Sequence, residues 1–337
     1  MPKRTGRYTI SMENDIFIEE SAGIAGSKES EGPLREYFDI SFKDDKIGQN
    51  SWEKAESSLQ TIAVNTVLEK ACLIPDDIDI IFAGDLLNQC ISSTFGLKEL
   101  NIPFMGQYGA CSTMAQTLAL GAIFTDSNAA NRAIAVTSSH FCSAERQFRL
   151  PLEYGGQRTP SAQWTVTGAG AALISKIRSS ARIAHVTIGR IKDLDIKDAN
   201  NMGAAMAPAA AETIMSFLSD TNTKISDIDL ILTGDLGKVG SQLLRELMQR
   251  EGVDISSIHN DCGMLIFDTV KQDVHSGGSG CGCSASVFCS YIMKNIKAGK
   301  LHNILFTATG ALMSPTSSQQ GESIPGIAHL IHICSDR

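Results

Sequence analysis

One cysteine, Cys111, lies where the turn 106–109 passes into a run of small apolar residues. Such a run is typical of a buried helix, so the sequence places the thiol at a helix N-terminus. That position carries partial positive charge and unpaired N–H groups, which favour the thiolate form of cysteine. The chemistry to consider is therefore nucleophilic attack by Cys111 on an acyl group, for which a base and oxyanion donors must also be present.

The elements that would position this cysteine occur twice along the chain. Segments 78–86 and 228–236 align without a gap, and six of their nine positions are identical. Each is a short apolar run that ends in Gly-Asp, which indicates a buried parallel strand followed by a turn. An amphipathic helix with a capping start is predicted at 51–70, in front of the first run.

The repeat continues downstream, where Cys111 corresponds to Cys283 at the start of a second small-residue helix. Further strands are predicted in matching places, at 133–137, 303–307, 169–174 and 326–331. Alternating strands and helices imply parallel sheets covered by helices, and helices made of small residues can lie between two sheets. The sequence therefore predicts an α/β fold of five layers, α/β/α/β/α, with an N-terminal half at 1–180 and a C-terminal half at 181–337.

This plan resembles the thiolase fold, in which a nucleophilic cysteine begins a buried helix of the first half. Enzymes resembling 3-oxoacyl-carrier-protein synthase III add a histidine and an asparagine from the second half. Here the matching places are Gly234-Asp235 and Gly280-Cys281-Gly282. Asp235 donates a hydrogen bond only when protonated, and its charge would oppose both a thiolate and an oxyanion. The resemblance therefore implies that the condensing machinery has been lost.

His275 supports the competing hypothesis. It lies near the place where biosynthetic thiolases carry a histidine, although the alignment puts it a few residues early. With His275 as the base, the protein would be an active acyltransferase of the thiolase or 3-oxoacyl-synthase III type that uses Cys111.

Other motifs resemble a single family along nearly the whole chain. They are 84–89, 137–140, 144–149, 153–157, 165–168, 206–211, 277–284 and 308–312. These segments are similar to the stage V sporulation protein AD family of spore-forming bacteria. The resemblance implies a non-enzymatic, thiolase-like protein that binds dipicolinic acid (pyridine-2,6-dicarboxylate) or its calcium chelate. It also implies small integral membrane partners from the same operon, peripheral association with the spore inner membrane, and dipicolinate movement during sporulation and germination.

A flat aromatic dianion needs a slot, hydrogen-bond donors, and positive charge or a metal ion. The candidate ligand-binding residues are expected at the facing ends of the two halves or just beyond the strand at 133–137: Cys111, Asp85, Ser138, His140, Arg146, Arg149, Asp235 and Cys281. The two arginines share a face if their segment is helical. Calcium that arrives with the ligand would use carboxylate oxygens, for which Asp85 and Asp235 qualify.

Structural roles compete with each of these assignments. Cys111 is small enough to fill a tight helix start, the two aspartates are at positions that often cap turns, and His140 fits a satisfied interior histidine. The arginines have acidic neighbours with which to pair. Cys281 and Cys283 lack the second ligand pair of a zinc site, and the nearby glycines lack the Lys-Ser/Thr of a P-loop. No metal site and no cofactor are therefore predicted.

Composition limits the partners. With 29 basic and 37 acidic residues, the net charge of −8 gives no basic footprint for nucleic acid. The sequence has no apolar run of the length that a membrane span needs and no signal peptide, so we expect any membrane association to be peripheral. Nine cysteines, several in apolar segments, indicate reduced thiols. A homodimer through the strand at 133–137 is expected from the thiolase resemblance.

Overall fold

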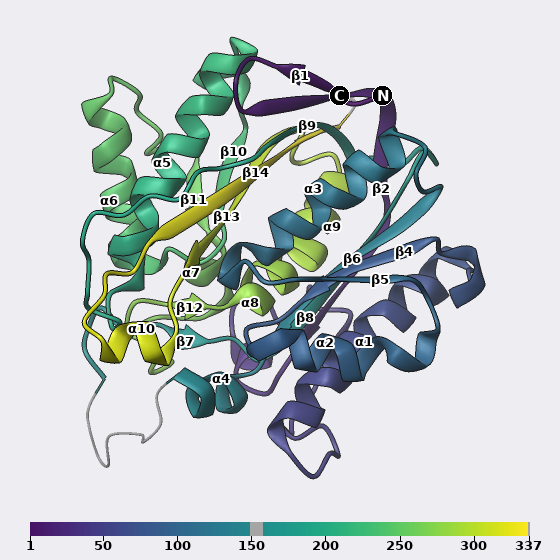
Figure 1. The fold of residues 1–337 in the computed structure, drawn as a ribbon, viewed down its shortest axis with the longest axis horizontal. Coiled ribbons are helices and arrows are strands. Elements are labelled where there is room, and N and C mark those ends of the chain that lie inside the picture. The colour runs from purple at the N-terminus through teal and green to yellow at the C-terminus, as the bar shows by residue number, and fades with distance from the viewer. Residues whose placement is uncertain (149–157, 336–337) are drawn as a thin grey trace.

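The computed structural model of the chain describes residues 1–148 and 158–335. Its strands form two half-sheets of the same order (Figure 1). The first half-sheet runs β5 (Phe104–Gln107), β4 (Ile80–Gly84), β6 (Arg132–Ser139), β8 (Gly168–Ser175), β2 (Thr9–Ala25). The second runs β11 (His259–Asp261), β10 (Leu230–Thr233), β13 (Asn303–Ala311), β14 (Gly326–Cys334), β9 (Arg182–Thr187). The repeat in the sequence is thus a repeat of topology.

Pairing between β2 and β9 joins the half-sheets into one continuous sheet. Two short strands, β1 (Lys3–Thr5) and β3 (Ile40–Ser41), also pair with β2. A separate small sheet pairs β7 (Trp164–Thr165) with β12 (Gly278–Ser279), one strand from each half. Hydrogen bonding between the two halves therefore occurs at both places.

The expectation that the sheets are wholly parallel was wrong. β4 runs parallel to β5 and β6, but β8 runs antiparallel to β6, and β14 runs antiparallel to β13. The link from β13 to β14 holds only the five-residue α10 (Pro315–Gln319) and does not carry the chain back over the sheet. Without such a crossover the next strand must return in the opposite direction.

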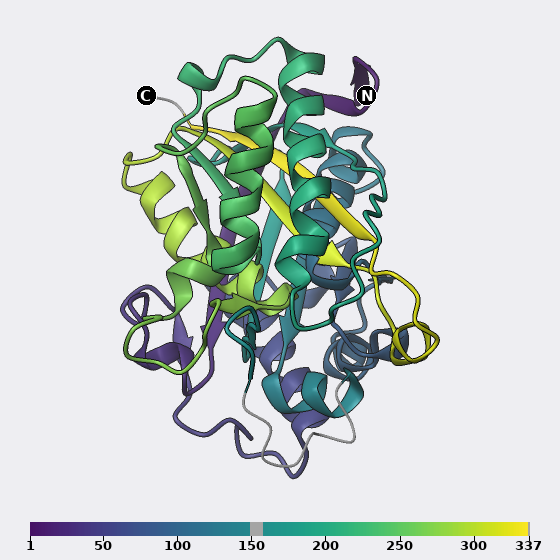
Figure 2. The same cartoon turned by 90° about the vertical axis from the view of Figure 1, so that its left-hand side faces the viewer.

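Helices complete the five predicted layers. On the outer faces lie α1 (Trp52–Ala71) with α2 (Ile91–Leu97), and α5 (Met202–Thr221) with α6 (Gly237–Arg250). Figure 2 shows α5 and α6 side by side in front of the strands of the second half. Between the half-sheets lie α3 (Thr113–Asp126), which contacts both, and α8 (Cys281–Val287). The remaining α-helices are α4 (Phe141–Phe148), α7 (Cys262–Ile266) and α9 (Met293–Lys297).

Small residues allow the central helices to approach the sheet closely. A Cβ atom added at Gly170, on β8, would lie 2.3 Å from the carbonyl oxygen of Ala285 in α8. Side chains from both halves, including Leu118, Phe288 and Phe306, share one core around these helices. Close backbone packing therefore places α8 directly against β8.

The matching aspartates of the repeat do the same work in each half. The Asp79 carboxylate accepts the N–H groups of Asn131 and Arg132, at 2.6 and 3.0 Å. Asp229 accepts those of His302 and Asn303, at 2.8 and 2.9 Å. Each aspartate thereby fixes the start of the neighbouring parallel strand, which explains why this position is retained in both copies.

The strand predicted at 133–137 cannot form a dimer interface. It is part of β6, which is bonded to β4 on one edge and to β8 on the other, so it has no free edge. The edge of the first half-sheet is β5, where Phe104 and Met105 are exposed. Among residues 1–148 and 158–335, no helix combines the length and the apolar character needed to cross a bilayer.

Candidate functional site

A cavity of about 300 Å³ opens between the two halves, and Cys111 forms part of its wall. Apolar side chains supply much of the lining: Leu86, Phe148, Met202, Leu312 and Met313. Polar side chains are interspersed among them: Tyr108, Gln163, Thr165, Asn200, Ser314 and Ser317. A small cavity with apolar walls and a few polar groups is the usual form of a small-molecule site.

Cys111 lies on the short 3₁₀ turn Ala110–Ser112 that leads into α3, as the sequence predicts, and only 7% of its surface is exposed. Burial, and then the carboxylate of Asp235, raise the pKa of this thiol well above its usual value. The Asp235 carboxylate interacts with this thiol, and the interaction favours the neutral form of the sulfur. Burial and Asp235 therefore outweigh the pKa-lowering effect of the helix N-terminus, and Cys111 is a neutral thiol.

Asp235 is fully buried beside the sulfur atom. Its carboxylate accepts the Gly280 N–H at 2.9 Å and the Thr309 hydroxyl at 3.0 Å. Burial raises its pKa from the usual 3.8 to about 7. An ionised Asp235 would repel a thiolate, and a protonated one is a poor base, so neither form activates Cys111.

His275 does not take the place of the missing base. Its Nε2 atom lies 3.3 Å from the Asp273 carboxylate, on a turn, and the residue does not line the cavity around Cys111. The imidazole is thus engaged away from the sulfur.

Asp85 and Cys281 lie behind the cavity wall. The Asp85 carboxylate accepts the N–H groups of Leu87 and Ser93, at 2.9 and 2.8 Å, and the Ser93 hydroxyl at 2.6 Å. The Cys281 thiol contacts the carbonyl oxygen of Ser138 at 2.9 Å and packs in one cluster with Cys111. The structure therefore brings Cys111, Asp235 and Cys281 together, whereas Asp85 organises the turn after β4.

Ser138 belongs to a buried network that sequence reasoning missed. Its hydroxyl donates to Glu56 at 3.3 Å and accepts from Gln60 at 2.9 Å, and Ser143 donates to the same glutamate at 2.5 Å. Burial and the nearby Asp85 raise the pKa of Glu56 from 4.5 to about 8. A charged residue at a core-facing position of the amphipathic helix at 51–70 was the available signal.

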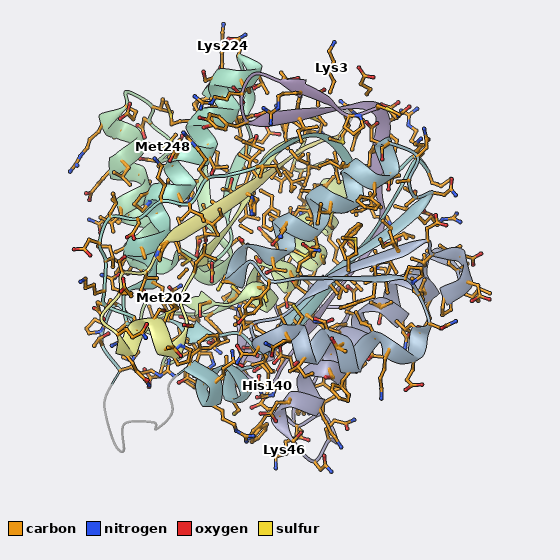
Figure 3. All side chains as sticks on the ribbon, in the orientation of Figure 1. Lys3, Lys46, His140, Met202, Lys224 and Met248 are labelled. Atoms are coloured by element: carbon orange, nitrogen blue, oxygen red, sulfur yellow. The ribbon has the colours of Figure 1, made fainter. Side chains whose placement is uncertain are left out.

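His140 and Arg146 point away from the cavity. The Nε2–H of His140 donates to the Asp45 carbonyl at 2.8 Å, and its Nδ1 accepts the Cys142 N–H at 3.1 Å, so both ring nitrogens are occupied. Arg146 pairs with Glu53 at 2.9 Å and is exposed. Figure 3 shows His140 near α4, on the side toward Lys46. Arg149 lies outside the described residues.

Glu145 and Arg158 were not predicted as site residues. Glu145 lines the cavity and pairs with Arg158 at 3.0 Å. Arg158 also lies over the rings of Phe141 and Trp164, 5.1 and 4.9 Å from their centroids. The described lining thus contains the Glu145 carboxylate, and its partner Arg158 lies outside that lining. Within the described ranges, no group of three or more His, Cys, Asp or Glu side chains could hold a metal ion.

Comparison with known proteins identifies relatives of the whole chain. The model of the family Stage V sporulation protein AD matches residues 6–334. Stage V sporulation protein AD of Bacillus subtilis (strain 168) is 47% identical over 327 residues, covering 97% of this chain and 96% of the relative.

Solved structures of low sequence identity have the same fold. The 3-oxoacyl-[acyl-carrier-protein] synthase III from Aquifex aeolicus VF5 superposes with a TM-score of 0.57 at 13% identity, over 99% of this chain and 100% of that one. A variant of OleA from Xanthomonas campestris gives a TM-score of 0.60 at 12% identity, over 95% and 98% of the two chains. These likenesses confirm the thiolase-like fold predicted from the repeat.

Replacing Asp235 with asparagine should make Cys111 more reactive. The substitution Asp235→Asn keeps an acceptor for the Gly280 N–H but removes the negative charge that opposes the thiolate. We expect Cys111 in the wild type to be alkylated by iodoacetamide more slowly than the exposed Cys72. In the variant its rate should rise about tenfold for each unit by which the pKa falls. Peptide mass spectrometry measures both rates, and a wild-type Cys111 faster than Cys72 would contradict this account.

The protonated state of Glu56 should appear in the pH dependence of stability. Its pKa is higher in the folded chain, so the folded state binds the additional proton between about pH 4.5 and 8. The wild type should therefore lose stability relative to Glu56→Gln as pH rises through this window, by at most about 1.4 kcal/mol per pH unit. Urea unfolding at several pH values measures the difference. A constant difference from pH 5 to 8 would show that Glu56 is ionised in the fold.

Proposed function

The chain belongs to the stage V sporulation protein AD family, and from this premise we propose that it binds dipicolinic acid without acting as an enzyme. The bound species would be the free acid or its calcium chelate. The protein would serve the spore membrane machinery that takes up dipicolinate during sporulation and releases it in germination. Its small integral partners would hold it at the spore inner membrane, on the forespore or spore.

The contact between Cys111 and Asp235 carries the non-enzymatic part of this proposal. A condensing enzyme needs a thiolate and donors for an oxyanion, whereas this thiol is buried against a carboxylate. The cavity wall at this point therefore supports holding a ligand rather than transferring an acyl group.

The lining of the cavity supports a flat, polar ligand. Apolar side chains such as Leu86 and Met313 offer faces for an aromatic ring. Hydroxyl and amide groups, among them Ser314, Ser317 and Asn200, could donate hydrogen bonds to carboxylates. The volume of about 300 Å³ is at the lower end of the range for small-molecule sites, roughly 300–1,000 Å³.

The charge of the cavity favours the calcium chelate over the free dianion. Among its described lining residues, Glu145 is charged and none is Lys, Arg or His. The ion pair with Arg158 offsets part of the Glu145 charge, and calcium held by dipicolinate prefers oxygen ligands such as a carboxylate. We therefore assign Glu145 to the calcium ion that enters as part of the ligand, in place of Asp85 and Asp235.

A homodimer is part of the proposal, with β5 as its interface. This edge strand has unpaired backbone groups and is followed closely by Tyr108, which is both exposed and part of the cavity lining. Ile91 and Phe95 on α2 are also exposed apolar side chains of the first half. Two copies of β5 could pair edge to edge and cover this surface.

Filling the cavity should abolish dipicolinate binding. Ala199 lines the cavity and is partly exposed, so Ala199→Trp places a large side chain in the cavity. We expect saturable binding of calcium dipicolinate to the wild type and at least tenfold weaker binding to this variant, measured by titration calorimetry. Ala129→Trp, at an exposed alanine outside the cavity lining, is the matched control and should bind normally. Absence of binding to the wild type, or equal binding to all three proteins, would refute the proposal.

Glu145→Gln tests the calcium assignment. The variant keeps an acceptor for Arg158 but removes the charge, so it should weaken binding of the calcium chelate more than binding of dipicolinate in chelator-treated buffer. A uniform loss of affinity for both forms would assign Glu145 to the structure of the wall.

Replacement of Met105 by lysine should separate the proposed dimer. The change puts two charges near the two-fold axis of a β5 pair, where they would be buried together. Light scattering after size-exclusion chromatography should give a dimeric mass for the wild type and a monomeric mass for Met105→Lys. A monomeric wild type contradicts the proposed interface.

A further inference from the structure

A second cavity, of about 290 Å³, lies at the end of the molecule that carries both ends of the described chain (Figure 1). Three cationic residues line it, Lys176, Arg178 and Arg182, together with the carboxylate of Asp15 and the hydroxyls of Ser179 and Ser180. The cluster occupies the turn between β8 and β9, where the two halves of the chain join. A concave cluster of cations suits a phosphate or another oxyanion.

Backbone contacts hold this turn in place. The Ser179 hydroxyl donates to the Ile18 carbonyl at 2.6 Å, and the Ile18 N–H donates to the Ala181 carbonyl at 2.9 Å. Arg182 is itself the first residue of β9 and pairs with Phe17 of β2. The cations therefore project from a turn fixed to the sheet, and less conformational entropy is lost when they bind a ligand.

The cationic cluster at this end is opposite in sign to the net charge of the whole protein, which is −8. The field of Arg182 also reaches the interior: after burial and the neighbouring His185, its charge contributes to the lowered pKa of His332. Lys3 and Arg4, both exposed, lie at the same end of the molecule, where Figure 3 labels Lys3. An acidic protein can approach an anionic surface if such an end faces it.

An apolar side chain protrudes from the same turn. Ile177 is 54% exposed and lies between Lys176 and Arg178 in the sequence. An exposed apolar residue flanked by cations is the combination by which peripheral proteins enter the boundary between headgroups and acyl chains.

We propose that the turn between β8 and β9 docks the protein directly onto an anionic membrane surface. The cavity would hold the phosphate of a lipid headgroup between Lys176 and Arg182, and Ile177 would enter the interface. The proposal adds a lipid contact to the proposed membrane association and does not depend on dipicolinate binding. The opposite end of the molecule, at Lys46 in Figure 3, would face away from the bilayer.

Co-sedimentation of the full chain with vesicles tests this directly. The vesicles contain phosphatidylcholine with roughly 30–40% phosphatidylglycerol. Binding of the wild type should be strong at low salt and should fall as salt screens the charges. The double variant Lys176→Gln/Arg182→Gln should lower the partition coefficient about fivefold for each charge removed. Ile177→Ser should weaken binding without changing its salt dependence.

Matched controls lie at the other end of the chain's fold. Lys43→Gln/Lys46→Gln removes the same charge from exposed lysines, and Val270→Ser removes an exposed apolar side chain that does not line the second cavity. These controls should bind vesicles as the wild type does. Circular dichroism and calcium dipicolinate titration of every variant separate loss of the fold or of the first cavity from loss of lipid binding.

Three results would overturn the proposal. The first is that the wild type does not bind anionic vesicles. The second is that the control variants lose as much binding as the variants of the turn, which would indicate a general charge effect. Saturable binding of inorganic phosphate that requires Lys176 and Arg182, without binding to vesicles, would assign the cavity to a soluble anion instead.

Discussion

The site depends on one buried contact, between the sulfur of Cys111 and the carboxylate of Asp235. Both positions belong to the repeated plan: Cys111 lies on the turn that leads into α3 in the first half, and Asp235 follows β10 in the second. Burial raises the pKa of both groups, so each holds its proton to a higher pH than it would in water. The contact favours the neutral form of the thiol.

The duplicated architecture explains why this contact forms. The facing ends of the half-sheets meet at α3 and α8, and the small residues along these helices let the backbones pack closely. Polar groups buried there need hydrogen-bond partners within the protein. The Asp235 carboxylate has such partners in Gly280 and Thr309, both in the second half. A fold shared with 3-oxoacyl-[acyl-carrier-protein] synthase III and OleA at 11–13% identity thus holds a buried carboxylate beside Cys111 in this chain.

Much of this arrangement could be predicted from the sequence because the repeat makes a strong pattern. The gapless match of 78–86 with 228–236 predicted equivalent strands, and the small residues after Cys111 predicted a buried helix at the correct place. The long strand β2 of the first half was missed, because it contains bulges that shift its register and four acidic residues that interrupt its apolar pattern. The antiparallel strands were also missed, since local composition does not show whether a connection crosses the sheet.

Most residues that line the cavity were harder to predict than Cys111. Asn200, Met313 and Ser317 lie in or beside connections whose positions depend on how the halves pack, and nothing in their local sequence marks them. His140 and Arg146 had suitable chemistry but lie on the wrong side of α4, a distinction that only tertiary structure makes.

The central claim, that Asp235 leaves Cys111 without acyl-transfer chemistry, is tested most directly by the mass of the intact protein after incubation with acyl-coenzyme A. The account predicts no added acyl group, and a thioester that maps to Cys111 would contradict it.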